Sequence, residues 1–119
     1  MKKDQYLLGL SEGSREYWDV QLDVGRYKNI IHLYLIEVPE KHRGKGYAKL
    51  LMKRICNYAD RQKCIVTLKP TAQFGADLER LVSFYRSFGF VFNADDNYRE
   101  DIAEVMYRCN ATESEQYYV

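Results

Sequence analysis

The sequence predicts an α/β or α+β fold, in which helices pack against a β-sheet, and three features of the chain lead to this prediction. Residues 30–38 are an apolar run rich in β-branched side chains that ends at Pro39, which is typical of a central strand. Beyond two glycines, apolar residues recur at helical spacing. A second buried strand at 65–68 and a second amphipathic helix then follow, and this order of elements is typical of such folds.

Each element has its own signal. Residues 15–24 alternate between polar and apolar side chains, which predicts a strand, and residues 25–29 predict a turn. The helix after the glycines carries its apolar stripe on Ala48, Leu51, Met52, Ile55 and Ala59.

In the second half of the chain, residues 71–75 predict a loop. A helix follows, with Asp77 as its N-cap and Gly89 as a left-handed residue at its end. Residues 90–92 and 104–108 predict short strands around an acidic turn at 93–97. We expect residues 110–119 to form a polar, frayed tail.

Composition limits the class of protein. A chain of 119 residues is long enough for one domain, here 1–119 with an N-terminal segment at 1–14, and 46% hydrophobic residues argue against wholesale disorder. No apolar run approaches the roughly 20 residues that cross a bilayer, and the first five residues do not resemble a secretory signal, so a cytoplasmic location is expected. Three cysteines without a CxxC pair argue against a disulfide framework and against a zinc site, and no metal is expected.

The charge distribution is uneven although the net charge is only +1. Residues 41–63 hold eight basic side chains against Asp60 alone, which gives +7 in this segment and −6 elsewhere. Such a segment suits either a polyanionic small molecule or a nucleic acid. The nearly neutral chain favours the small molecule.

The glycines lie where a strand runs into a helix. Amide groups at a helix start have no intrahelical partner, and the helix dipole is positive there, so the position suits an anion. Gly44 and Gly46 allow a close approach of the backbone, and Arg43 and Lys45 add charge. The chain has neither Gly-x-Gly-x-x-Gly nor the Gly-Lys-Ser/Thr of a P-loop, which argues against a dinucleotide or nucleoside triphosphate site.

Two blocks of sequence resemble the Gcn5-related N-acetyltransferase (GNAT) family. Residues 43–48, Arg-Gly-Lys-Gly-Tyr-Ala, match the family signature Gln/Arg-x-x-Gly-x-Gly/Ala at the turn from the fourth strand into the next helix, and Val38-Pro39-Glu40 precedes them as in some members. Residues 84–90, Phe-Tyr-Arg-Ser-Phe-Gly-Phe, resemble the family's Phe-Tyr-x-x-x-Gly-Phe. The resemblance implies a mixed, mostly antiparallel twisted sheet with two main helices packed on it and with the N-terminal helices reduced or absent.

The resemblance also implies the donor and its site. Acetyl-CoA would place its pyrophosphate on the amides of Arg43, Gly44, Gly46 and Ala48, with Lys45 and Lys49 screening the charge. The pantetheine arm would pair with the backbone of the strand at Ile36 and Val38. The candidate cofactor-binding residues are Ile36, Val38, Arg43, Gly44, Lys45, Gly46, Tyr47, Ala48 and Lys49.

For catalysis, the resemblance implies direct attack of an amine on the thioester through a tetrahedral intermediate. Tyr85 matches the tyrosine that protonates the departing thiolate in many members, and its alternative is a core tyrosine. His32 lies eleven positions before Arg43, where several members carry the base, and its alternative is a structural strand histidine. Glu37 is the second candidate base, expected on the opposite strand face from His32. Tyr34 is a candidate relay through water.

Two departures from the family concern the acceptor. Residues 74–77 replace the usual asparagine-containing approach, and residues 1–14 are too few for two N-terminal helices. We therefore expect an open acceptor side that suits a protein lysine or N-terminus, or a pocket completed by a partner subunit as in a homodimer. Four acidic residues are candidates to attract a cationic acceptor, and their alternative is a solvated acidic loop: Asp95, Asp96, Glu100 and Asp101. The alternative functions are a non-catalytic acyl-CoA sensor or assembly subunit and, as a third hypothesis, a nucleic-acid-binding module that uses residues 41–63.

Overall fold

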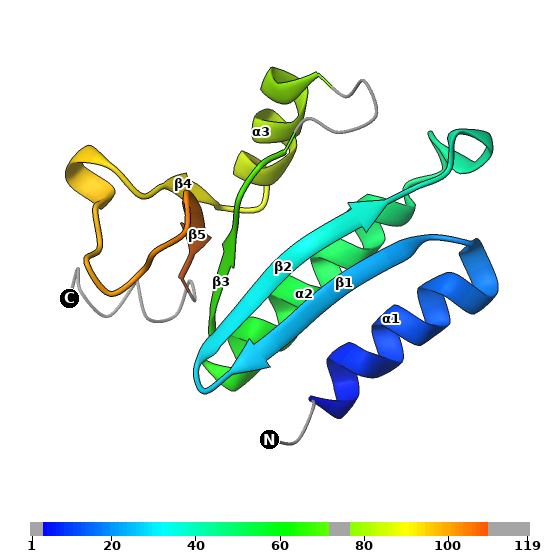
Figure 1. Cartoon of the computed structure of the whole chain (residues 1–119), viewed down its shortest axis with the longest axis horizontal. Coiled ribbons are helices and arrows are strands. Elements are labelled where there is room, and N and C mark those ends of the chain that lie inside the picture. Colours follow the sequence, from blue (N-terminus) through cyan, green and yellow to red (C-terminus); the bar gives the residue numbers. More distant parts are fainter. Residues whose placement is uncertain (1–3, 72–76, 110–119) are drawn as a thin grey trace.

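A mixed five-stranded sheet runs through the described part of the chain, with its strands in the order β1-β2-β3-β5-β4 (Figure 1). The computed structural model describes residues 4–71 and 77–109, so most of the predicted loop at 71–75 and the predicted tail at 110–119 lie outside the described residues. The elements are α1 (Gln5–Trp18), β1 (Gln21–Tyr27), β2 (Ile30–Glu37), η1 (Glu40–His42), α2 (Tyr47–Gln62), β3 (Ile65–Leu68), α3 (Leu78–Arg86), β4 (Val91–Phe92), η2 (Asp95–Asn97) and β5 (Met106–Arg108).

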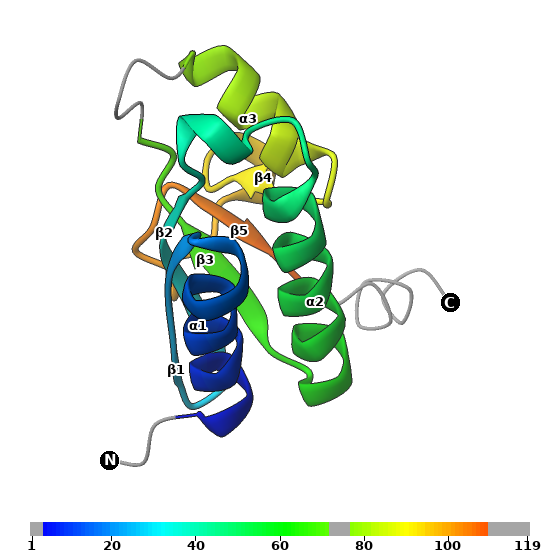
Figure 2. The same ribbon diagram turned by 90° about the vertical axis from the view of Figure 1, so that its right-hand side faces the viewer.

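All neighbouring strands pair antiparallel except β2 and β3, which are parallel. The predicted mixed, mostly antiparallel sheet is therefore confirmed. Helices α1 and α2 lie side by side across one face of it, which we call the helix face (Figure 2). The apolar side of α3 packs against the same core.

Helix α1 corrects the prediction of a strand at 15–24. Residues 15–18 are helical, and β1 begins only at Gln21. The side chain of Asp4 caps the helix by accepting from the amide of Leu7 at 3.1 Å, and Asp19 ends it in a left-handed conformation with φ 54°. Its buried residues Leu7 and Ser14 lie seven positions apart, two helical turns, and therefore on one face.

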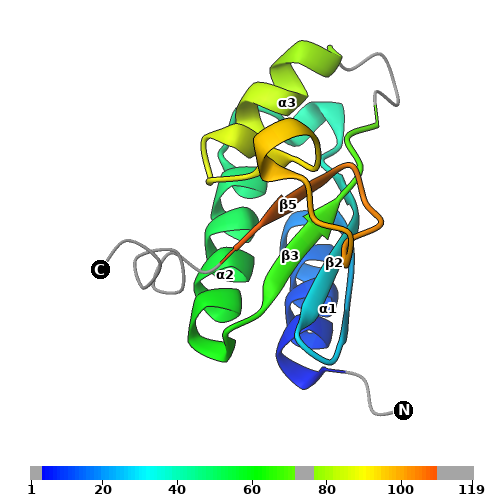
Figure 3. The ribbon, with the colours of Figure 1, turned by 90° about the vertical axis from the view of Figure 1, so that its left-hand side faces the viewer.

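Two cores lie on the two faces of the sheet. The main core fills the space between the strands and the helices, and its fully buried members include Ile31, Leu51, Ile55 and Val66. A smaller core on the opposite face joins Ile65, Ile102 and Tyr107. Figure 3 shows this opposite side, where the segment between β4 and β5 lies over the sheet. Farther along the sheet, on β1 and β2, Tyr27 and Tyr34 are more than half exposed.

No helix in residues 4–71 and 77–109 is long and apolar enough to span a membrane.

Candidate functional site

The segment between β2 and α2, residues 38–46, bends through two glycines with positive φ. Gly44 has φ 83° and Gly46 has φ 81°, a region that residues with a Cβ rarely adopt. A Cβ added at either position would meet no other atom within 4 Å. The glycines are therefore required by the backbone conformation, and the space beside them is open to a ligand. We call residues 38–46 the glycine loop.

The start of α2 offers free amide donors. Among the described residues, no side chain caps this helix, and its first turn holds no acidic residue, so the N–H groups of Tyr47, Ala48 and Lys49 have no acceptor in the helix. The family signature implies that the amide of Arg43 binds the pyrophosphate. In the structure, this amide already donates to the carbonyl oxygen of Glu40 at 3.2 Å. The helix start is thus a better anion site than the Arg43 amide.

Two basic side chains of the glycine loop, Arg43 and Lys45, contact groups within it. The Nε of Arg43 donates to the carbonyl of Val38 at 3.3 Å, and the Nζ of Lys45 lies 3.2 Å from the Nδ1 of His42. Lys49, one turn into α2, is exposed. Basic residues therefore precede and follow the helix start along the chain, which suits a pyrophosphate.

The end of α1 braces this loop. The ring of Trp18 stacks on that of Tyr47, with centroids 4.8 Å apart and planes 9° from parallel. Lys41 and Asp19 form an exposed ion pair at 3.6 Å. Tyr47, a candidate binding residue, is thus turned toward α1, and its side chain supports the loop.

Strands β2 and β3 part before β2 ends. Their pairing runs from Ile30–Ile65 to Leu33–Leu68, and β2 then continues to Glu37 without a described partner on that side (Figure 1). Ile36 and Val38 pack against the main core with their side chains. The backbone of this stretch is left for a ligand to pair with, on the side where β3 departs.

A β-bulge in β2 changes which side chains share a face. Leu33 pairs with Val24 and Leu35 with Asp23, so Tyr34 is an extra residue without a partner in β1. His32 pairs with Gly25 and Glu37 with Gln21, which lie four positions apart in β1 and therefore on one face. The expectation that Glu37 lies opposite His32 is wrong, because the bulge reverses the alternation between them.

His32 contacts two polar groups on the face away from the helices. Its Nδ1 lies 2.7 Å from the Oγ1 of the fully buried Thr67, its register partner in β3. The same nitrogen lies 3.2 Å from the Oε1 of Glu104. Sequence reasoning missed both partners, since the pairing of β2 with β3 and the path of the chain before β5 are set only in three dimensions.

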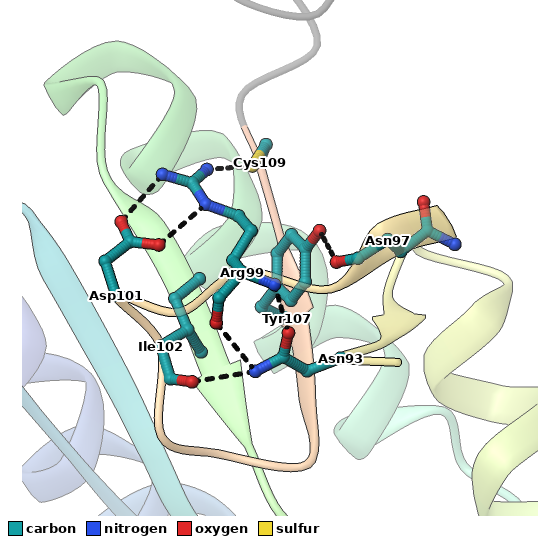
Figure 4. A network of polar contacts seen from close by, with 7 residues as sticks. All are labelled: Asn93, Asn97, Arg99, Asp101, Ile102, Tyr107 and Cys109. Carbon is teal, nitrogen blue, oxygen red and sulfur yellow. Dashed lines mark hydrogen bonds and ion pairs between the residues drawn. The ribbon is translucent and has the colours of Figure 1, made fainter. Parts of the chain in front are cut away.

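Glu104 lies in the segment at 93–105, which is organised around the side chain of Asn93. Figure 4 shows the contacts of Asn93 with Arg99 and Ile102. The side-chain amide of Asn93 donates to the carbonyls of Arg99, Ile102 and Glu104 at 3.3, 2.7 and 3.3 Å, and its oxygen accepts from the amide of Arg99 at 2.6 Å. We call residues 93–105 the Asn93 loop. The two ends of the loop are therefore held together across its interior.

The acidic residues of this loop are not equivalent. Asp101 forms a bidentate pair with Arg99, at 3.1 and 2.8 Å, and these hydrogen bonds lower the pKa of Asp101 (Figure 4). Asp95, Asp96 and Glu100 are exposed. Three of the four acids thus remain available to attract a cation, and Asp101 is neutralised by Arg99.

Tyr85 lies on α3 and packs against the main core, on the other side of the sheet from His32. Its ring meets those of Phe84 and Phe90 at centroid distances of 5.6 and 5.9 Å. Burial raises the pKa of Tyr85, so the phenol keeps its proton at neutral pH. None of the described residues hydrogen-bonds to its hydroxyl.

Glu37 belongs to a pocket of about 350 Å³ at the edge of the sheet. The pocket joins the end of α1 to the start of β1 and the end of β2, and it is lined by Arg15, Asp19, Val20, Gln21, Glu37 and Pro39. The two candidate bases therefore share a face of β2 but have different surroundings.

A model of the Acetyltransferase (GNAT) family matches residues 1–90. The chain therefore belongs to this family. The fold agrees, because solved acetyltransferase structures of the family share it. No curated protein matches the chain at a significant level.

Three solved structures illustrate the similarity. The anti-CRISPR protein AcrVA5 is 19% identical with a TM-score of 0.56, covering 74% of this chain and 87% of its own. Ard1 from Thermoplasma volcanium is 25% identical with a TM-score of 0.55, covering 76% of this chain. Naa50 from Arabidopsis thaliana, in complex with the bisubstrate analogue CoA-Ac-MVNAL, is 19% identical with a TM-score of 0.52, covering 75% of this chain. This chain spans 62% of the length of each of the last two.

Proposed function

We propose that the chain transfers an acetyl group from acetyl-CoA to a primary amine. The observation that carries the proposal is the glycine loop itself, which joins an uncapped helix start to a strand end that has lost its neighbour. Coenzyme A carries an anionic pyrophosphate, which the helix start would hold, and an extended pantetheine arm, which would pair with β2. Family membership supports the same donor.

The residues present fit this donor. Positive φ at Gly44 and Gly46, with no atom where a Cβ would stand, leaves room for phosphate oxygens beside the backbone. The amides of Tyr47, Ala48 and Lys49 point from the positive end of a 16-residue helix. Lys45 and Lys49 would screen the phosphates, and Ile36 and Val38 would offer backbone groups to the pantetheine arm.

His32 and Tyr85 lie on the two faces of the sheet and would act where β2 and β3 part. His32 takes the proton that the attacking nitrogen must lose as the new C–N bond forms the tetrahedral intermediate, and the C–S bond of the thioester breaks when this intermediate collapses. Tyr85 gives its proton to the departing sulfur, which leaves as a thiol, and the phenolate then takes a proton from solvent. Glu37 stays the second candidate base, since it lies on the same face as His32.

The acceptor is a large amine, such as a protein lysine or N-terminus. His32 itself is partly covered by Glu104, but next to it on β2 the side chain of Tyr34 is 64% exposed. Asp95, Asp96 and Glu100 are exposed on the Asn93 loop, where they would attract a cationic substrate. Naa50, which shares this fold, is solved in complex with the bisubstrate analogue CoA-Ac-MVNAL, and this supports a large acceptor.

Thermal denaturation with acetyl-CoA, CoA, ATP and NAD tests the donor. A ligand at about 100 times its dissociation constant stabilises the folded state by about 2.7 kcal/mol, so acetyl-CoA should raise the Tm clearly. ATP and NAD should leave it nearly unchanged. Equal responses to all four, or none to acetyl-CoA, would sink the proposal. Stabilisation without acetylation of any lysine-rich peptide or polyamine would favour the non-catalytic acyl-CoA-binding subunit.

Tyr85→Phe tests the acid. The substitution removes a hydroxyl that bonds to no described residue, so the Tm should change little. Loss of a general acid should lower kcat by about 100-fold or more, measured as thiol release. Tyr17→Phe is the matched control, because Tyr17 is 76% exposed on α1. Unchanged turnover in Tyr85→Phe would make Tyr85 a core residue only.

A further inference from the structure

We infer that Glu104 is a positioning residue that fixes the tautomer of His32, so that its Nε2 faces the substrate without a proton. Two oxygens converge on the Nδ1 of His32, the Oγ1 of Thr67 at 2.7 Å and the Oε1 of Glu104 at 3.2 Å. The negative charge of the carboxylate disfavours a lone pair on the nitrogen beside it, so Nδ1 carries the hydrogen and donates it to the Oγ1 of Thr67. The neutral ring then has its lone pair on Nε2.

Thr67 alone would not decide the tautomer. A hydroxyl both donates and accepts, so Thr67 can satisfy Nδ1 in either protonation state. Its side chain is fully buried and its position is set by the pairing of β2 with β3. Thr67 therefore locates the ring, and Glu104 selects which nitrogen carries the proton.

The placement of Glu104 is built into the loop. Glu104 accepts from Asn93 through its backbone carbonyl, and the next residue, Val105, accepts from the amide of Asn93 at 2.8 Å. Ile102 anchors the same stretch in the smaller core. The carboxylate is about 70% shielded from solvent, which strengthens its interaction with the ring.

The catalytic consequence rests on the proposed function. When the Nε2 of His32 takes the proton from the attacking amine, the ring becomes an imidazolium with both nitrogens protonated. The carboxylate of Glu104, 3.2 Å from Nδ1, then forms an ion pair with the imidazolium and stabilises it. The proton leaves Nε2 to solvent before the next turnover. Glu104 touches neither substrate nor donor.

Long-range 1H–15N NMR of the imidazole nitrogens tests the inference without any substrate. The chain has two histidines, so His42 serves as an internal reference. In the native chain at a pH where His32 is neutral, we expect Nδ1 of His32 to be protonated. Glu104→Gln should shift the population toward the Nε2–H tautomer, because a side-chain amide can also donate to Nδ1. Glu100→Gln, an exposed glutamate of the same loop, should leave the tautomer unchanged.

Two further variants separate positioning from structure. Thr67→Val keeps the shape of the buried side chain, and the Nδ1–H tautomer should persist in it. Glu104→Asp should restore part of the tautomer preference that Glu104→Gln loses. With an active acceptor, Glu104→Gln should lower kcat by about 10-fold or more, with the KM for acetyl-CoA unchanged.

The outcomes discriminate between the two proposals. An Nε2–H tautomer in the native chain, or a tautomer that Thr67→Val changes and Glu104→Gln does not, would overturn the role of Glu104. A chain that does not bind acetyl-CoA would refute the proposed function and leave the NMR result standing.

Discussion

At the scale of single residues, Gly46 combines a backbone requirement with a binding role. Its φ of 81° costs a residue with a Cβ about 1–2 kcal/mol. We therefore expect Gly46→Ala to lower the free energy of unfolding by about that amount, measured by urea denaturation. The new methyl group would also stand beside the helix start, so the rise in Tm with acetyl-CoA should shrink or disappear.

Gly9→Ala is the matched control for this prediction. Gly9 is exposed within α1, and a Cβ there would meet no atom within 4 Å. Because alanine is the better helix former, the control should gain about 0.5–1 kcal/mol and keep its response to acetyl-CoA. A Gly46→Ala variant as stable and as responsive as the native chain would show that the loop conformation does not matter for binding.

At the scale of elements, the Asn93 loop depends on one side chain. Asn93→Ala removes the side chain that donates to the carbonyls of Arg99, Ile102 and Glu104 and accepts from the amide of Arg99. Losing such bonds costs about 1–3 kcal/mol, so the midpoint of urea unfolding should fall accordingly. Because the loop also delivers Glu104, the same variant should disturb the tautomer of His32.

Asn97→Ala is the comparison for the loop. Asn97 is exposed, and it is its backbone carbonyl that accepts from the hydroxyl of Tyr107. Removing its side chain should change stability by less than about 0.5 kcal/mol. Equal losses in both variants would mean that Asn93 does not organise the segment.

Helix α1 shows where sequence reasoning at this scale fails. The polar and apolar alternation of residues 15–24 predicts a strand. The prediction is right for residues 21–24, which belong to β1. Residues 15–18 instead continue α1, because Trp18 packs on Tyr47 and Leu7 enters the main core. A tertiary contact thus overrides a short local pattern, and the single N-terminal helix that results braces the glycine loop.

At the scale of the whole molecule, ionisable groups buried in the cores make stability fall at high pH. Burial raises the pKa of Cys56 from its ordinary 9.0 to about 11. The unfolded chain therefore loses this proton first as the pH rises, and the free energy of unfolding declines between about pH 9 and pH 11. A shift of this size corresponds to about 2–3 kcal/mol. Burial raises the pKa of Cys64, Tyr58, Tyr85 and Tyr107 as well.

Urea unfolding at pH 7, 9 and 10.5, under reducing conditions, measures this decline. Cys56→Ala should begin with a lower stability at pH 7 because it leaves a small cavity. Its further loss between pH 9 and pH 10.5 should be smaller than in the native chain, since it has no thiol to ionise at that position. Parallel curves for the two chains would contradict the assignment of Cys56.

The sequence by itself determines the local parts of this protein. The glycine loop, α2 and α3 follow from glycines, caps and apolar periodicity within a few residues of each other, and the structure has them where they are predicted. Asp77 caps α3, and Gly89 has a φ of 94°. These features depend on backbone preferences and on neighbours along the chain, which can be read without knowing the fold.

Only the tertiary structure decides how the candidate catalytic groups meet. The bulge at Tyr34 arises from the pairing of β2 with β1, and it brings Glu37 to the face of His32. Glu104 reaches His32 only because the Asn93 loop folds back over the sheet. Strand register and loop path depend on contacts between residues far apart in the chain, and no local pattern encodes them.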